Sequence, residues 1–215
     1  MSIATREVEH VARPLEGASS LRFNDGRCDR QGRFWSGTVQ EARVVGEAGL
    51  WRLDGEREAR RMESALTVVN GIAFSPDDRT MYVADSHVRE IYAYDFDAHA
   101  GNLGARRLFA RLASDAGMPD GATVDVDGCL WVAAIHGGRL IRYAPDGRLD
   151  RTIVMPVSQP TSCEFGGEGL RTLFVTSARM RLDNAALARE PLAGSLFALD
   201  VGTGGLPTPR YRSES

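Results

Sequence analysis

A turn followed by a short apolar strand recurs four times along this chain of 215 residues. Each copy has an aromatic residue at the same place in its strand, at positions 35, 82, 131 and 174. The spacings between these positions are 47, 49 and 43 residues. A second strand-like run follows each copy, at 49–53, 90–94, 139–143 and 195–199. Several short strands in each unit of ~40–45 residues, separated by Gly- and Asp-rich turns, are typical of β-propeller blades.

Helical periodicity is nearly absent, and only residues 184–189 predict a helix of one or two turns within a loop. A parallel sheet with crossover helices would need about ten or more helical residues between its strands. The sequence therefore predicts an all-β, radial fold that forms one domain over residues 1–215. At ~45 residues per blade, the chain has room for about four to five blades. A propeller protects its sheet edges by closing, so the chain is either a small propeller or part of a larger one.

Composition excludes several classes of function. The net charge is −3, and all 26 positively charged residues are Arg. A chain without Lys cannot use a Schiff-base lysine, a pyridoxal-phosphate lysine or a P-loop lysine. With a net negative charge, the protein has no excess of positive charge that would attract nucleic acid or an anionic membrane.

The cysteines and the N-terminal residues indicate a compartment. The three cysteines, Cys28, Cys129 and Cys163, lie far apart and lack metal-binding spacing, which favours reduced thiols. Residues 1–10 do not have the pattern of a signal peptide, and no apolar run approaches the ~20 residues that span a bilayer. We therefore expect a cytoplasmic protein without a membrane or nucleic-acid partner, while its oligomeric state stays open.

Three polar segments occupy equivalent points just before the turn and strand of consecutive repeats. They are Arg-Phe-Asn-Asp-Gly at 22–26, Asn-Gly at 70–71 and Pro-Asp-Gly at 119–121. Because the first strand of each blade lines the channel, Asn24, Asn70 and Asp120 are expected at one end of it. Amide and carboxylate oxygens suit a hard or borderline divalent cation. Asn and Asp before Gly are also common in simple turns, and that alternative stays open at this point.

The ordered set of motifs resembles the SMP-30/gluconolactonase/regucalcin-like family. The resemblance covers about residues 14–207 and rests on RFNDG (22–26), NG with SPD (70–77), PDG (119–121), WVA (131–133), GGR (137–139) and TSCEFGG (161–167). It implies a six-bladed β-propeller, incomplete here, with one divalent cation (Ca, Zn, Mn or Fe) at the channel mouth. It also implies hydrolysis of sugar lactones.

The same resemblance implies roles for single residues. Asn70 and Asp120 are similar to two metal ligands of the family, and Asp120 also to its candidate base. Arg22 and Asn24 are similar to its substrate-contacting pair. Two further residues, Asp25 and His136, are possible participants because they lie beside these motifs.

One departure from the family bears on activity. The family's first metal ligand is a glutamate in an early blade, upstream of the segment that corresponds to 22–26. Only 21 residues precede Arg22 here, and Glu16, six residues before it, is interpreted as a linker residue. The resemblance therefore predicts a member without its N-terminal blade or blades, with weakened metal binding and impaired activity.

Two other functions stay open. The chain could be a non-catalytic propeller that binds a metal or a sugar, with a calcium-linked regulatory role, and the departure above favours this alternative. It could also hydrolyse organophosphates or other esters.

Three structural expectations accompany these hypotheses. Asp125–Gly128 forms a hairpin turn rather than a calcium loop, Asp85 braces its blade, and Cys129 and Cys163 lie in the core.

Overall fold

The computed structural model describes residues 10–55 and 58–212, and in these ranges it contains fifteen strands in four antiparallel sheets. From the channel outward, the first blade contains β1 (Leu21–Cys28), β2 (Phe34–Gln40), β3 (Ala48–Leu53) and β4 (Ala59–Leu66). The second contains β5 (Val69–Phe74), β6 (Thr80–Asp85), β7 (Glu90–Asp97) and β8 (Asn102–Arg111). The third contains β9 (Met118–Val124), β10 (Leu130–Ile135), β11 (Arg139–Tyr143) and β12 (Leu149–Val154). The fourth contains β13 (Pro160–Gly166), β14 (Thr172–Ser177) and β15 (Leu196–Asp200).

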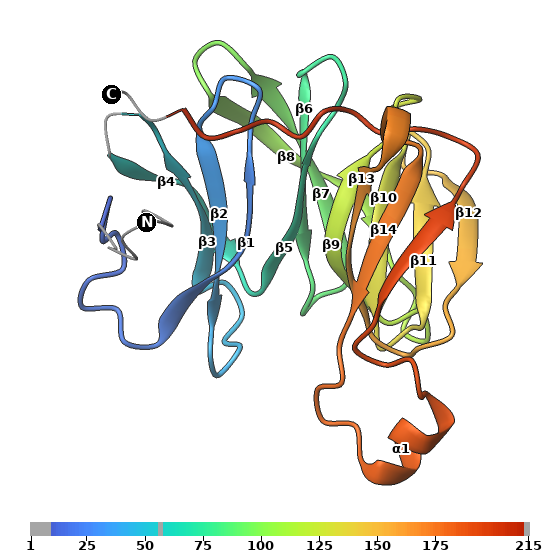
Figure 1. Cartoon of the computed structure of the whole chain (residues 1–215). Helices are drawn as coiled ribbons and strands as arrows, with labels where there is room; N and C mark the ends of the chain where they lie inside the picture. Colours follow the sequence, from blue (N-terminus) through green and yellow to red (C-terminus); the bar gives the residue numbers. More distant parts are fainter. Residues whose placement is uncertain (1–9, 56–57, 213–215) are drawn as a thin grey trace, which may run out of the picture.

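The four sheets stand side by side around a central channel, so the predicted all-β propeller is confirmed (Figure 1). Their first strands, β1, β5, β9 and β13, form its wall, and each contacts the next. The second strand-like run of each repeat is β3, β7, β11 or β15, as the spacing predicted. The described helical segments are η1 (Glu168–Leu170) and α1 (Asn184–Arg189), and α1 coincides with the helix predicted from the sequence. No helix within the described ranges is long and apolar enough to cross a membrane.

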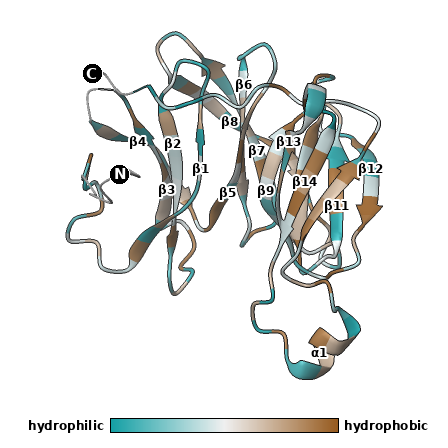
Figure 2. Cartoon of the chain, in the orientation of Figure 1, coloured by the Kyte–Doolittle hydropathy of each residue, from teal (hydrophilic) through white to brown (hydrophobic). Residues whose placement is uncertain are grey.

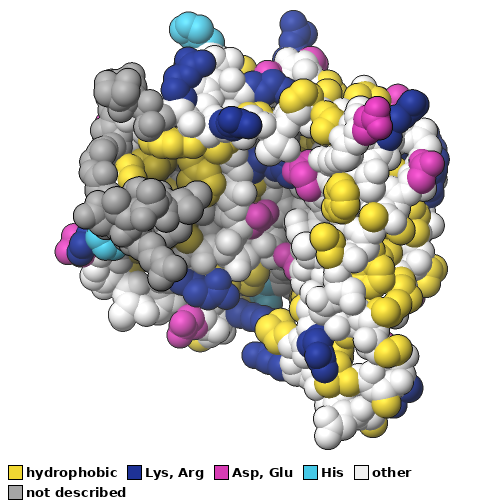
Figure 3. Space-filling view, in the orientation of Figure 1, with side chains coloured by type: hydrophobic (Ala, Val, Ile, Leu, Met, Phe, Trp, Pro, Cys, Tyr) yellow, Lys and Arg dark blue, Asp and Glu magenta, His cyan; other side chains and the backbone are white. Residues whose placement is uncertain are grey.

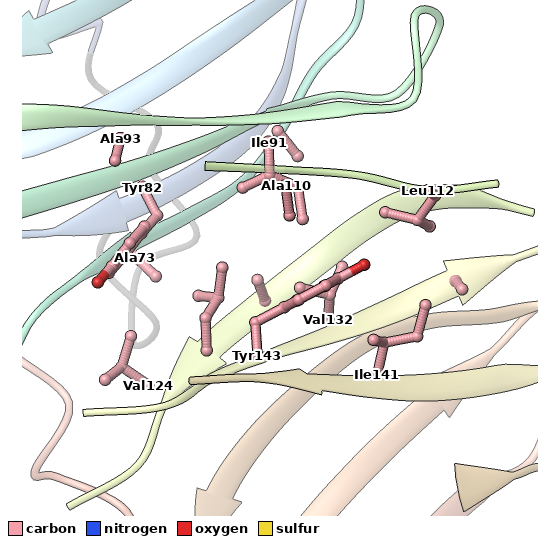
Figure 4. Close-up of a cluster of buried hydrophobic side chains, with 14 of the residues drawn as sticks. Ala73, Tyr82, Ile91, Ala93, Ala110, Leu112, Val124, Val132, Ile141 and Tyr143 are labelled. Atoms are coloured by element: carbon pink, nitrogen blue, oxygen red, sulfur yellow. The ribbon is translucent and has the colours of Figure 1, made fainter. Parts of the chain in front are cut away.

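Strands of all four sheets carry hydrophobic residues (Figure 2). Their apolar side chains are buried where neighbouring blades face each other. Between the second and third blades, Tyr82 and Tyr143 belong to one buried cluster together with small and aliphatic residues of β9 and β10 (Figure 4). Trp35 is fully buried between the first and second blades, and Trp131 between the third and fourth. Cys129 and Cys163 are also buried, as expected from the sequence. Packing of side chains between blades therefore holds the sheets together around the channel.

Two fully buried aspartates explain why the turn before the strand recurs. The Asp29 carboxylate accepts the indole N–H of Trp35 at 2.9 Å and two backbone N–H groups of its own turn. In the third blade, Asp125 accepts the indole N–H of Trp131 at 2.8 Å and again two turn N–H groups. A buried carboxylate is stable only when donors compensate it, and each turn supplies them. The segment 125–128 is therefore a hairpin turn, as predicted. Both carboxylate oxygens of Asp125 accept hydrogen bonds.

Asp85, at the end of β6, braces the connection between the first two blades. Its carboxylate accepts the backbone N–H groups of Thr67 at 2.8 Å and Val68 at 3.1 Å. These two residues link β4 to β5, so the carboxylate holds one blade against the next. The predicted bracing role is confirmed.

After β15, residues 201–212 run from the fourth blade back to the first across one end of the channel (Figure 1). On the way, Gly205 forms an isolated bridge with Asp125 of the third blade. The backbone N–H of Arg212 then donates to the Gly32 carbonyl at 2.9 Å. The hydroxyl of Tyr211 donates to the Asp54 carbonyl at 3.0 Å. The segment thereby connects the fourth, third and first blades at the end where the inner strands finish.

Candidate functional site

The inner strands are irregular at one common level, close to where each strand begins. Register shifts lie between Phe23 and Gly26 in β1, between Asn70 and Ala73 in β5, and between Pro160 and Ser162 in β13. In β9 the shift lies between Pro119 and Ala122. A β-bulge changes the direction of the side chains it contains, and bulges are common beside functional sites. All three polar segments predicted from the repeat lie at this level.

A continuous chain of hydrogen bonds crosses three blades at this level. Arg22 Nη1 donates to Asn24 Oδ1 at 3.1 Å, and Asn24 Nδ2 donates to Asn70 Oδ1 at 2.7 Å. Asn70 Nδ2 then donates to Ser86 Oγ at 2.8 Å, and Ser86 Oγ donates to the Pro119 carbonyl at 2.5 Å. The structure therefore brings Arg22, Asn24 and Asn70 into direct contact and ends the chain at the peptide before Asp120.

Asp120 is half-buried in β9, and its pKa is raised to about 7. The main cause is burial, which penalises the charged carboxylate, and the nearby negative charge of Asp25 adds to it. The Gly121 N–H acts in the opposite direction by hydrogen bonding to the charged form. A carboxyl with a pKa near neutrality has the property required of a general base or acid.

Asp25 lies at the centre of the site, although the sequence marked it only as a possible participant. Its carboxylate accepts the N–H groups of Gly26 at 2.8 Å and Ile72 at 3.2 Å, so it spans the first two blades. Burial raises the pKa of Asp25, while these hydrogen bonds and the charge of Arg27 lower it. Acidic side chains are visible in the hollow at the centre of the molecule (Figure 3). The Asp25 carboxylate is therefore close enough to Asp120 to raise the pKa of that residue.

The glycines of two polar segments allow the blades to approach each other here. A Cβ on Gly71, whose φ is 55°, would lie 2.8 Å from the Asp120 carbonyl oxygen. A Cβ on Gly121 would lie 2.2 Å from Ser162 Oγ of the fourth blade. Both separations are far below van der Waals contact, so any larger residue would push neighbouring inner strands apart. Gly71 and Gly121 are therefore part of the site's geometry.

Two residues marked from the sequence lie outside the hydrogen-bond chain. His136 is exposed in the turn between β10 and β11, with a φ of 63°, and joins none of the site's hydrogen bonds in the described ranges. Glu16 is exposed in a turn before β1, consistent with a linker residue. Ser86, in contrast, takes part in the hydrogen-bond chain but was not marked from the sequence. No repeat pattern marks it, because the equivalent position in the third blade is Ile135.

A divalent cation needs several oxygen ligands held close together. In the described part of the chain, no three His, Cys, Asp or Glu residues are grouped to hold a metal. Asn70 Oδ1 and the Asp120 carboxylate are nevertheless oxygen donors of the kind that hard cations prefer. Burial and the nearby Asp25 charge both raise the pKa of Asp120, and a cation beside its carboxylate would counteract both effects. The donors therefore fit such a cation in kind, with few protein ligands to hold it.

Known proteins resemble this chain in sequence and in fold. Residues 1–179 match the family model described as the SMP-30/Gluconolactonase/LRE-like region. A 6-deoxy-6-sulfogluconolactonase of Pseudomonas putida is 41% identical over 204 residues, covering 94% of this chain and 70% of the relative. An L-arabinolactonase of Azospirillum brasilense is 41% identical over 202 residues, covering 92% and 66% respectively. A solved structure, described as a calcium-binding regucalcin from Agrobacterium tumefaciens, has a TM-score of 0.91 and 30% identity, covering 97% and 71%.

Proposed function

The chain belongs to the SMP-30/gluconolactonase/LRE-like family, and from that premise we propose that it hydrolyses a sugar lactone at the channel mouth that contains Asp120. The substrate class comes from the relatives, two of which are named as sugar lactonases. The observation that carries the proposal is the placement of Asp120. Its carboxyl has a pKa of about 7 and follows directly after the peptide where the Arg22–Asn24–Asn70–Ser86 hydrogen-bond chain ends.

The chain's own residues supply binding and proton transfer in this proposal. Arg22 donates to hydroxyl or ring oxygens of the sugar, because a guanidinium offers several directed donors. Asn24 contributes its Oδ1 as an acceptor for a sugar hydroxyl, since both Nδ2 hydrogens donate to the Val69 carbonyl and Asn70 Oδ1. The ionised Asp120 carboxylate accepts a proton from a water molecule as the water oxygen bonds to the lactone carbonyl carbon. The ring C–O bond then breaks, and the proton passes to the departing ring oxygen. One lactone and one water thus give one hydroxy acid.

A divalent cation held by Asn70 and Asp120 would act as a Lewis acid that polarises the lactone carbonyl. Asn70 Oδ1 accepts one hydrogen bond, from Asn24, and an amide oxygen has two lone pairs, so it can still serve as a ligand. Because the described site has few carboxylate ligands, we propose weak binding of the cation and activity that depends on its concentration.

The test is a substrate panel with matched variants. The protein is assayed for acid release from gluconolactone, 6-deoxy-6-sulfogluconolactone and L-arabinolactone, with Ca²⁺, Mn²⁺ or Zn²⁺ and with EDTA. We expect Asp120→Asn to lower kcat/KM about 100-fold or more, as loss of a general base does. Asp146→Asn, which changes an exposed turn aspartate, is the control and should leave the rate unchanged. Equal rates for Asp120→Asn and the unchanged protein would contradict the proposal.

A second candidate function is cation binding without turnover. It is favoured by the described regucalcin relative, which carries the name of a calcium-binding protein. Calorimetric binding of Ca²⁺, lost in Asp120→Asn and unaccompanied by hydrolysis of any lactone in the panel, would support it. A phosphotriester and an aryl ester in the same panel test the alternative of an organophosphate or ester hydrolase.

A further inference from the structure

Ser86 lies between two groups that the proposed reaction needs. It follows β6 directly, and only 5% of its surface is exposed. Its hydroxyl contacts the Asn70 amide on one side and the Pro119 carbonyl on the other. Because Pro119 precedes Asp120, this single hydroxyl connects the second blade to the strand that carries the proposed base.

The two ends of the hydrogen-bond chain fix its direction. A guanidinium can only donate, so Arg22 requires the oxygen of Asn24 to face it. A backbone carbonyl can only accept, so the Ser86 proton must point to Pro119. The Ser86 oxygen is then left to accept from Asn70, which places Asn70 Nδ2 toward Ser86 and Asn70 Oδ1 toward Asn24. Both amide orientations follow from groups that have no alternative role.

We propose that Ser86 is a positioning residue, whose hydroxyl holds the Asn70 carboxamide from one side while Asn24 holds it from the other, and links it to the Asp120 strand. Its effect on catalysis rests on the function proposed above, but its effect on Asn70 does not. Without the hydroxyl, the buried amide of Asn70 loses its acceptor. Rotation of the amide by half a turn would then bring Asn70 Nδ2 against Asn24 Nδ2, two donors with no acceptor between them.

The first test observes the amide directly. The chain has four asparagines, so selective ¹⁵N labelling of Asn gives four side-chain NH₂ pairs in an NMR spectrum. The Asn70 pair is assigned from its loss in Asn70→Asp. In metal-free protein without substrate, Ser86→Ala should speed hydrogen exchange of the Asn70 NH₂ group about tenfold or more and shift the Asn24 signals. The signals of Asn102 and Asn184, which take no part in the hydrogen bonds between Arg22 and Pro119, should not change.

Ser75→Ala is the matched control. Ser75 is also a buried serine of the second blade with hydrogen-bonded neighbours, but it lies at the opposite end of β5. General loosening of the blade would change the Asn70 signals in both variants, whereas positioning changes them only in Ser86→Ala. Unchanged exchange and unchanged shifts of Asn70 in Ser86→Ala would overturn the inference.

The second test measures the consequence for the site. Ser86→Ala should lower kcat for lactone hydrolysis about tenfold, with a smaller change in KM, and should weaken Mn²⁺ binding measured by electron paramagnetic resonance. Ser75→Ala should change neither. Absence of lactone hydrolysis in the unchanged protein would contradict the proposed function, and the NMR comparison would still decide the role of Ser86. Wild-type kcat and Mn²⁺ affinity in Ser86→Ala would overturn the positioning role in the reaction.

Discussion

Arg27 of β1 and Glu164 of β13 form an ion pair across the channel, with 2.5 Å between Nη2 and Oε2, although 137 residues separate them in sequence. The same Nη2 atom also donates to the Ala122 carbonyl at 3.0 Å. The Thr123 hydroxyl donates to the other carboxylate oxygen of Glu164 at 2.8 Å. Two side chains therefore connect the inner strands of the first, third and fourth blades.

Loss of this ion pair should destabilise the fold. Arg27→Met removes the cation and leaves the partly buried Glu164 carboxylate with the Thr123 hydroxyl. We expect a loss of about 1–2 kcal/mol in the free energy of unfolding, since Glu164 is partly hydrated and the pair is screened. The measurement is urea unfolding, with a double-mutant cycle using Glu164→Gln. Arg107→Met breaks an exposed pair with Asp95 and should cost no more than about 0.5 kcal/mol; equal losses in the two variants would contradict the expectation.

The two buried turn aspartates should contribute similarly to stability. Asp29→Ala leaves the buried Trp35 indole N–H and Arg33 Nε without their acceptor, and we expect it to cost about 2–4 kcal/mol. Asp125→Ala should cost a comparable amount because Trp131 makes the equivalent contact. Urea unfolding measures both. Losses below about 0.5 kcal/mol would show that the repeated turn does not depend on its aspartate.

The stability of the metal-free protein should fall as pH rises from about 4 to about 7. The pKa of Asp120 is raised to about 7 in the folded chain, against about 3.9 in an unfolded one. Between these values the folded state holds a proton that the unfolded state has released, so raising the pH favours unfolding. Urea midpoints in EDTA at several pH values measure the effect. Asp120→Asn should flatten this dependence while Asp146→Asn leaves it in place, and a full slope in Asp120→Asn would contradict the assignment.

Gly121→Ala should impair both folding and hydrolysis. The added methyl group would lie 2.2 Å from Ser162 Oγ and 2.8 Å from its Cα, so β9 and β13 must separate beside Asp120. We expect a loss of about 1–3 kcal/mol, typical of overpacking, together with lower kcat. Gly204→Ala is the control, because its methyl group would meet its nearest neighbour, the Leu170 carbonyl oxygen, at an ordinary 3.4 Å. Equal stability and rate in the two variants would rule out a need for close approach at Gly121.

The regular spacing of the four aromatic anchors along the sequence was enough to predict the fold. Spacing of the aromatic anchors identified β2, β6, β10 and β14, because each anchor follows a turn that the chain repeats. The outer strands were not identified. β12, for example, is largely exposed and mixes polar with apolar residues, and such a strand gains its pairing from β11 rather than from a pattern of its own.

The site was only partly predictable. Repeat symmetry placed Asn24, Asn70 and Asp120 at one level, because equivalent positions in successive blades share a distance from the channel end. Ser86 and the central place of Asp25 could not be derived in this way. No other blade has a serine at the position equivalent to Ser86. The position of Asp25 depends on a bulge in β1, and the sequence alone does not show how β1 pairs with β2 there.

The return of residues 201–212 to the first blade constrains the order of events during biosynthesis. The hydroxyl of Tyr211 bonds to the Asp54 carbonyl over a separation of 157 residues. A nascent polypeptide on the ribosome cannot make this contact until Tyr211 has emerged, whereas strands within one blade can pair much earlier. Blades should therefore form sequentially during translation, and the last of them becomes joined to the first only as a late step.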